Sequence, residues 1–184
     1  MKKAFLGGKA KFKNPIGIVS PKLPDFSLIK NQVREILTSG NLTNHSHYVQ
    51  EFEEKLRNRF KVPHVVNVAN GTLGLILALE GLQRSGEVIL PSFTYCATAH
   101  ALYWSRHTPV FVDILPDTFT IDPEKVEAAI TKNTAAIMAV HIFGHPCEID
   151  ALTDISKRHG IPLLFDSAHA FGSSYKDKPI GQFG

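Results

Sequence analysis

The sequence predicts an α/β protein with a three-layer α/β/α arrangement, in which helices cover both faces of a mostly parallel sheet. From about residue 65 onward, short apolar runs alternate with helical patterns, and this alternation is typical of a parallel sheet. The runs are almost continuously apolar, as expected for strands that are buried on both faces. The chain has 184 residues, 43% hydrophobic and 20% charged, so it can bury a core of ordinary size.

The first part of the chain precedes this alternation and has a different character. Lysines and prolines dominate residues 1–24, which we interpret as an arm that lies on another surface or frays. Asp25 is a suitable cap for a following helix, and Gly40 is a suitable end. The apolar face of that helix consists of Phe26, Ile29, Val33, Ile36 and Leu37. We therefore expect an arm and a first helix over residues 1–40, followed by a second amphipathic helix.

The remaining elements are expected in a regular order. The apolar runs and helical periodicities predict strands at residues 65–68, 88–90, 110–114, 135–142 and 162–166, helices at residues 73–82, 94–105, 122–130 and 149–159, and a hairpin at residues 175–180. Asp122-Pro123-Glu124 is a typical helix start, with a capping residue, a proline and then an acid in the first turn.

Composition excludes several classes of protein. There are 20 basic and 17 acidic residues, and the excess is too small and scattered to indicate a nucleic-acid partner. Cys96 and Cys147 are far apart, so neither a disulfide framework nor a zinc ribbon is indicated. No apolar run approaches the ~18 residues of a membrane helix, and no apolar core of a signal peptide follows the first lysines. We expect a cytoplasmic protein without a membrane partner.

Two strand ends carry candidate ligand-binding residues, because ligands of open α/β sheets bind outside the carboxyl ends of the strands. Asn70-Gly71-Thr72 stands at a helix start, where free N–H groups favour an anion such as phosphate, although a plain helix cap is the alternative. Tyr95 follows the next strand and could stack on a flat ligand, although core packing is the alternative.

A third strand end places a carboxylate at the mouth of a buried strand. Asp166 directly follows Leu163-Leu164-Phe165, and a charge there is unfavourable unless it meets a cation or several donors. It is therefore the residue most indicative of function, with a helix N-cap as the alternative. His169 lies three residues on, and a satisfied core or rim histidine is its alternative.

A metal site is a further alternative. His141, His145, Asp166 and His169 could gather at adjacent strand ends, although His141 and His145 flank a Phe-Gly turn rather than sharing a helix face. We do not predict a metal. A serine hydrolase is excluded, because the chain has no G-x-S-x-G elbow.

The ordered set of motifs resembles one family. These stretches match it at family-like spacing over nearly all of the chain after residue 40: Leu42-Thr43-Asn44, Asn70-Gly71-Thr72, Pro91-Ser92-Phe93-Thr94-Tyr95 with Ala97-Thr98-Ala99, Pro109-Val110-Phe111-Val112-Asp113-Ile114, Asp117-Thr118-Phe119, Ile121-Asp122-Pro123, residues 141–144, Asp166-Ser167-Ala168-His169-Ala170, Tyr175-Lys176 and Ile180-Gly181. The chain is thus similar to the N-terminal half of a DegT/StrS-type nucleotide-sugar aminotransferase, a pyridoxal-phosphate enzyme of fold type I.

This resemblance implies a cofactor and a role for each candidate residue. The cofactor would be pyridoxal 5′-phosphate, with its phosphate held by Gly71 and Thr72 and its ring stacked on Tyr95. Asp166 would pair with the protonated pyridine nitrogen, and His169 would lie near the phenolic oxygen. A pyridinium is the electron sink of transamination, and a buried carboxylate keeps it protonated.

The resemblance also implies a reaction and a domain organisation. Family members transfer an amino group, usually from glutamate, to a nucleotide-linked keto sugar in amino-sugar and lipopolysaccharide synthesis, and they act as homodimers. Their Schiff-base lysine is expected beyond Gly184, so residues 41–184 would form only part of the cofactor-binding large domain, without the C-terminal small domain. We therefore expect this chain by itself to lack the catalytic lysine.

Two alternatives stay open on the sequence. One is a dehydratase of the same family that uses pyridoxamine phosphate and has histidine in place of the lysine. The other is a non-catalytic relative that retains the half-domain. The segment in which the dehydratase and the aminotransferase would differ lies beyond Gly184.

Overall fold

The computed structural model describes residues 2–14, 21–43 and 45–184, so Asn44 of the Leu42-Thr43-Asn44 stretch lies outside the described residues. The chain divides into two units, Met1–Ser46 and His47–Gly184. The first unit contains a 3-10 turn, Ala4–Leu6, and helix α1, Phe26–Ser39. The side chain of Asp25 accepts the N–H of Ser27 at 2.8 Å, and Gly40 ends the helix with φ 69°, which confirms the predicted cap and end.

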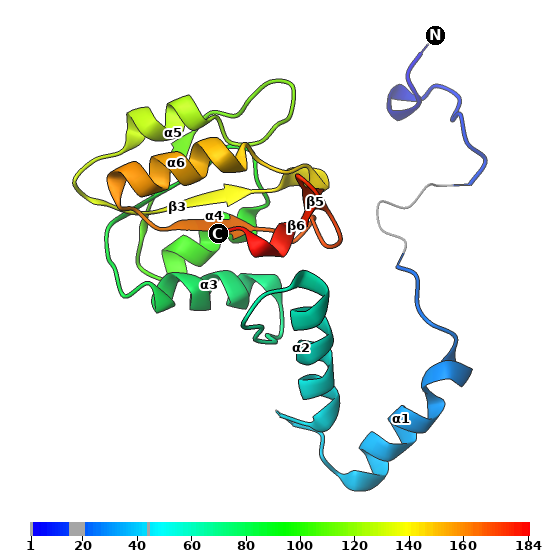
Figure 1. The fold of residues 1–184 in the computed structure, drawn as a ribbon. Helices are drawn as coiled ribbons and strands as arrows, with labels where there is room; N and C mark the ends of the chain where they lie inside the picture. The colour runs from blue at the N-terminus through cyan, green and yellow to red at the C-terminus, as the bar shows by residue number, and fades with distance from the viewer. Residues whose placement is uncertain (1, 15–20, 44) are drawn as a thin grey trace. The chain divides into compact units, whose positions relative to one another are not determined.

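The second unit contains the sheet (Figure 1). Its main elements are α2 (His47–Phe60), α3 (Gly71–Gly81), β1 (Glu87–Pro91), α4 (Cys96–Trp104), β2 (Thr108–Val112), α5 (Pro123–Ala129), β3 (Thr134–Val140), α6 (Ile149–His159) and β4 (Leu163–Asp166). The four strands are parallel in the order β2-β1-β3-β4, so the predicted mostly parallel sheet is confirmed.

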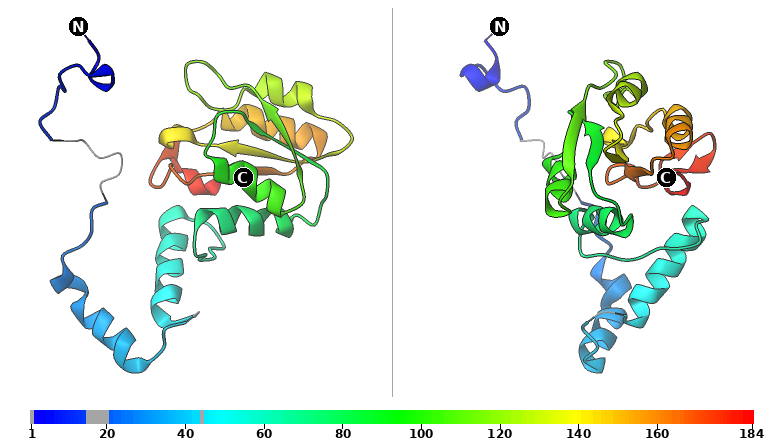
Figure 2. Two further views of the ribbon diagram at one scale, coloured as in Figure 1. Left: turned by 180° about the vertical axis from the view of Figure 1, so that it is seen from behind. Right: turned by 90° about the vertical axis from the view of Figure 1, so that its left-hand side faces the viewer.

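Two separate cores lie on the two faces of the sheet. Val88 and Leu90 pack with α3 and α4, whereas Ile89, between them in β1, packs with α5 and α6. Figures 1 and 2 show α5 and α6 on one side of the sheet and α3 and α4 on the other. This division explains why the strands are apolar at consecutive positions and confirms the three-layer arrangement.

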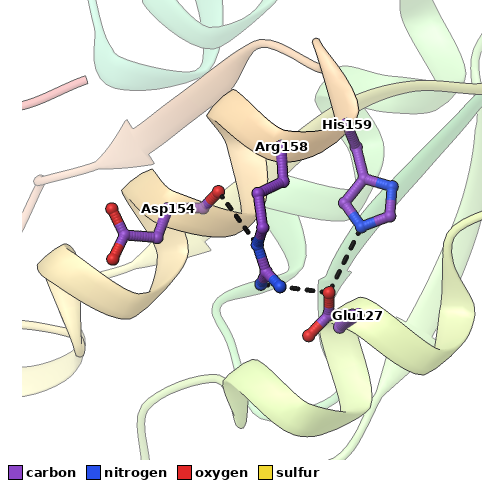
Figure 3. Close-up of polar contacts among 4 residues, drawn as sticks. All are labelled: Glu127, Asp154, Arg158 and His159. Atoms are coloured by element: carbon purple, nitrogen blue, oxygen red, sulfur yellow. Dashed lines mark hydrogen bonds and ion pairs between the residues drawn. The ribbon is translucent and has the colours of Figure 1, made fainter.

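An ion cluster at the surface links α5 to α6 (Figure 3). The carboxylate of Glu127 accepts from Arg158 Nη2 at 3.0 Å and from His159 Nε2 at 3.2 Å. Arg158 Nε also donates to the carbonyl oxygen of Asp154 at 3.4 Å. These side chains are partly exposed, and the cluster joins two helices that cover the same face of the sheet.

The prediction of a strand at residues 65–68 was wrong. The segment is irregular, Val66 is 78% exposed, and the N–H of Asn67 bonds to the side chain of Glu53 at 2.7 Å instead of to a neighbouring strand. A strand needs another strand to satisfy its backbone groups, and in the described part of the chain none lies beside this segment. Apolar periodicity reports side chains and not the presence of that neighbour.

Smaller differences concern the ends of elements. The strand expected at residues 110–114 is β2, Thr108–Val112, and the helix expected from residue 94 begins at Cys96 as α4. The predicted hairpin forms from β5 (Ser174–Tyr175) and β6 (Lys178–Pro179). Among the described residues, none of the helices is long and apolar enough to cross a membrane.

Candidate functional site

A cavity of about 290 Å³ opens where the carboxyl ends of β3 and β4 meet the amino ends of α3 and α4. It is lined by Gly71, Thr72, Leu75, Thr94, Tyr95, Ala97, Val140, Ile142, Asp166, Ala168 and His169. All five residues that the sequence singles out for ligand binding therefore line one cavity: Gly71, Thr72, Tyr95, Asp166 and His169. This is the position in which open parallel sheets bind ligands.

Asp166 ends β4 and is only 8% exposed. Its Oδ1 accepts the N–H of Ala168 at 3.1 Å, and its Oδ2 accepts the hydroxyl of Thr98 at 2.9 Å. The Ala168 bond is the local turn contact that an N-cap would make, but no helix follows it. Two donors thus fix the carboxylate at the base of the cavity.

The hydroxyl of Thr98 has a second partner besides Asp166. Thr98 is fully buried in α4, and its Oγ1 lies 2.8 Å from Oγ1 of Thr94. A hydroxyl has one proton, and Thr98 gives it to Asp166, so Thr94 must be the donor in the contact between the two threonines. The result is a directed chain of hydrogen bonds, Thr94 to Thr98 to Asp166. Sequence reasoning missed this role of the two threonines, for which their spacing of four residues is the only local signal.

The charge of Asp166 has no cationic partner within the described chain. No lysine, arginine or histidine forms an ion pair with it in residues 2–14, 21–43 and 45–184. His141 is close enough for the Asp166 charge to favour its protonation, but burial dominates and lowers the pKa of His141 to about 4. Since His141 is then neutral at pH 7, the cavity keeps an uncompensated negative charge and favours a cationic group.

His141 and Cys147 belong to the packing behind the cavity. The fully buried His141 ring stacks on Phe165 with centroids 4.6 Å apart, and its Nδ1 accepts the N–H of Cys147 at 3.0 Å. Burial raises the pKa of the Cys147 thiol to about 12, so it is not a nucleophile. His145 is exposed, and the described residues contain no group of three or more potential metal ligands.

The amino end of α3 forms another part of the cavity wall. The side chain of Asn70 caps the helix by accepting the N–H of Leu73 at 3.0 Å. The N–H groups of Gly71 and Thr72 have no hydrogen-bond acceptor among the described residues, and a Cβ on Gly71 would meet nothing within 4 Å. Two free donors, a hydroxyl and the helix dipole therefore favour an anion here.

Two ring side chains complete the cavity. Tyr95 is 70% exposed and stands at the amino end of α4, where its ring is available to a planar ligand. The imidazole of His169 accepts the N–H of Phe143 at Nδ1, with 3.3 Å between the two nitrogens. The cavity thus joins an anion-binding end, a cation-binding base and an aromatic wall, and it suits a flat ligand that carries both charges.

The fold is that of an α/β protein with a cavity at the carboxyl ends of two parallel strands. The chain belongs to the DegT/DnrJ/EryC1/StrS aminotransferase family, whose sequence profile matches residues 26–184. It is 40% identical over 161 residues to a dTDP-4-amino-4,6-dideoxy-D-glucose transaminase of Escherichia coli, a match that covers 88% of this chain and 43% of that protein.

Solved structures give the same assignment. A crystal structure of DesI in the presence of its TDP-sugar product superimposes with a TM-score of 0.89 and 41% identity, over 98% of this chain and 46% of that one. A structure of Escherichia coli GDP-4-keto-6-deoxy-D-mannose-3-dehydratase with bound hydrated PLP superimposes with a TM-score of 0.78 and 25% identity, over 88% of this chain and 43% of that one. The chain therefore spans about half the length of the relatives that it matches.

Proposed function

We propose that this chain forms the cofactor-binding part of a pyridoxal-phosphate aminotransferase that acts on a nucleotide-linked keto sugar. The observation that carries the proposal is the set of groups in one cavity. Within the described residues, the carboxylate of Asp166 has no cationic partner and the N–H groups of Gly71 and Thr72 have no acceptor. Pyridoxal 5′-phosphate is flat and carries a basic ring nitrogen and a phosphate, so its two charged ends suit these two groups.

Each of the five residues receives one role in this proposal. Asp166 accepts a hydrogen bond from the protonated ring nitrogen and keeps that nitrogen protonated, while Thr98 and Ala168 hold the carboxylate in place. Gly71 and Thr72 bind the phosphate, Tyr95 stacks on the ring, and His169 contacts the phenolic oxygen. When bound, the cofactor supplies the electron sink and carries the amino group.

The substrates belong to the proposal as well. The E. coli relative is named a transaminase of a dTDP-linked amino sugar, and the DesI structure contains a TDP-sugar product, which supports a nucleotide-linked keto sugar as acceptor. Glutamate is the proposed amino donor. The proposed reaction also uses a Schiff-base lysine, and none of the described residues that line the cavity is a lysine. A homodimer and a cytoplasmic location are part of the same proposal.

A dehydratase is the second candidate, because a sugar dehydratase with bound PLP shares the fold of this chain at 25% identity. Mass spectrometry of the sugar product separates the two reactions. Transamination replaces the keto oxygen by an amino group, whereas dehydration removes a hydroxyl group as water and leaves no nitrogen on the sugar.

Cofactor binding is tested by calorimetric titration with pyridoxamine 5′-phosphate. This form has no aldehyde, so it does not react with the surface lysines and reports the non-covalent site alone. We expect it to bind more tightly than either unphosphorylated pyridoxamine or inorganic phosphate, because each of these engages only one end of the cavity. Equal affinity for pyridoxamine and its phosphate would remove Gly71 and Thr72 from the proposed role.

A further inference from the structure

Phe143 has an unfavourable backbone conformation next to the cavity. It lies in the 3-10 turn Ile142–Gly144 that follows β3, with φ 52° and ψ 21°, in the left-handed region that residues with a Cβ rarely adopt. Its side chain is 74% exposed, so burial of the ring does not account for the conformation. The conformation does have a local result, because it brings the N–H of Phe143 to the imidazole of His169.

Two further contacts and a close backbone approach at Gly144 relate the two segments. The Phe143 and His169 rings are nearly parallel, with 5° between their planes and 6.0 Å between centroids. The hydroxyl of Ser173 donates to the carbonyl oxygen of Gly144 at 3.0 Å. A Cβ on Gly144, whose φ is +83°, would lie 2.9 Å from the carbonyl oxygen of His169. The position of the Phe143 N–H relative to His169 is therefore fixed by several independent contacts.

We infer that Phe143 is a positioning residue that sets the tautomer of His169 and thereby the kind of ligand atom that His169 can bind. A backbone N–H only donates, so Nδ1 of His169 must be the unprotonated nitrogen of the neutral ring. The ring proton is then at Nε2, the only ring nitrogen left for a ligand. His169 consequently offers the cavity a hydrogen-bond donor and selects an acceptor oxygen.

The identity of that oxygen rests on the proposed function, in which it is the phenolic oxygen of the cofactor. The tautomer itself does not depend on the cofactor, because every group that sets it belongs to the chain. The two parts can therefore be tested separately.

The tautomer is tested by ¹⁵N NMR of the ligand-free chain in alkaline buffer, where an ordinary imidazole is neutral. The chain has nine histidines, and the signals of His169 are those missing from the His169→Gln variant. We expect an unprotonated Nδ1, a protonated Nε2 and a scalar coupling between the Phe143 amide nitrogen and Nδ1 across the hydrogen bond. A protonated Nδ1, or absence of the coupling, would overturn the inference.

Two substitutions of Phe143 distinguish the effect of its backbone conformation from the effect of its ring. Phe143→Gly removes the ring but tolerates a positive φ, so the coupling and the tautomer should persist. Phe143→Val disfavours that conformation, so the coupling should vanish and the tautomers should become those of a histidine whose Nδ1 accepts no backbone hydrogen bond. If Phe143→Val does not fold, the spectra of the wild-type chain and Phe143→Gly decide, and loss of the coupling in Phe143→Gly would contradict the backbone role.

Addition of pyridoxamine 5′-phosphate tests the ligand. We expect the Nε2–H resonance of His169 to shift on binding and to shift less with an analogue that lacks the phenolic oxygen. If His169 has the expected tautomer but pyridoxamine 5′-phosphate does not bind, the proposed function is refuted and the inference about Phe143 stands. Binding with an unchanged Nε2–H resonance would refute the role of His169 as donor.

Discussion

Two carboxylates of this molecule have opposite surroundings. Glu127 is on the surface between α5 and α6, its side chain is 42% exposed, and it pairs with Arg158 and His159 (Figure 3). Asp166 is 8% exposed at the end of β4, where a hydroxyl and one backbone N–H are its only donors within the described residues. The exposed carboxylate thus has a cationic partner in Arg158, and the buried one has none within the described residues.

An exposed ion pair contributes little to stability, because water screens it and solvates either charge alone. A buried carboxylate without a cation is unfavourable in the ligand-free protein, and such groups concentrate at functional sites. We therefore propose a functional role for Asp166 and a structural one for Glu127. In the proposed function, a cationic ring nitrogen in the cavity would make the position of Asp166 favourable.

The largest expected effect comes from removing the buried charge. Asp166→Asn should weaken the binding of pyridoxamine 5′-phosphate by about 10- to 100-fold, because a hydrogen bond to a charged group contributes about 1.5–3 kcal/mol. Isothermal titration calorimetry measures the change. Glu127→Gln makes the same chemical change at the surface and should leave the affinity as it is, and an equal loss in both variants would abolish the distinction between the two carboxylates.

The second effect concerns the support of Asp166. Thr98→Val removes the hydroxyl that reaches Oδ2 and should lower the free energy of unfolding by about 1–3 kcal/mol, because a buried acceptor loses its partner. Denaturant unfolding measures it, and Thr98→Ser, which keeps the hydroxyl, is the matched control. A Thr98→Val protein as stable as Thr98→Ser would show that this hydrogen bond does not stabilise the fold.

A smaller effect is expected at the anion-binding end. Thr72→Val should weaken the binding of pyridoxamine 5′-phosphate by roughly 2- to 10-fold, since one hydrogen bond contributes about 0.5–1.5 kcal/mol. The affinity for unphosphorylated pyridoxamine should not change, and the two titrations are compared directly. A matching loss for pyridoxamine would assign Thr72 to the ring instead of the phosphate.

The smallest expected effect concerns the surface carboxylate of Glu127. Hydrogen bonds from His159 and then Arg158 lower the pKa of Glu127 below its ordinary value. Its contribution to stability is therefore present above the ordinary glutamate pKa and is lost as the pH falls through the lowered one. The small difference in unfolding free energy between the wild type and Glu127→Gln should shrink as the pH falls below the ordinary glutamate pKa. A difference that grows over this range would contradict the pairing.

The sequence predicts which residues line the cavity better than it predicts the contacts that surround them. Asp166 stands directly after an apolar strand and Gly71 stands at a helix start, so local rules identify both. Thr98 is 68 residues from Asp166, and only the tertiary fold brings its hydroxyl to the carboxylate. The conformation of Phe143 is likewise invisible, because a bulky aromatic residue is not a usual turn former at positive φ.

The same limit explains the error at residues 65–68. Val65, Val66 and Val68 form an apolar run that could pair, but pairing depends on a neighbour from elsewhere in the chain. For β1 that neighbour is present on both sides, in β2 and β3, and its prediction was confirmed. Strand prediction therefore succeeded where the described chain supplies partners and failed where it supplies none.

The central claim is that Asp166 is kept unpaired for the cationic ring nitrogen of a pyridoxal-type cofactor. The most direct measurement is the ¹⁵N NMR spectrum of pyridoxamine 5′-phosphate labelled at the ring nitrogen and bound to the chain in alkaline buffer, where the free ring has lost this proton. The account predicts a protonated ring nitrogen in the wild-type complex and loss of that proton with Asp166→Asn. An unprotonated nitrogen in the wild-type complex would contradict it.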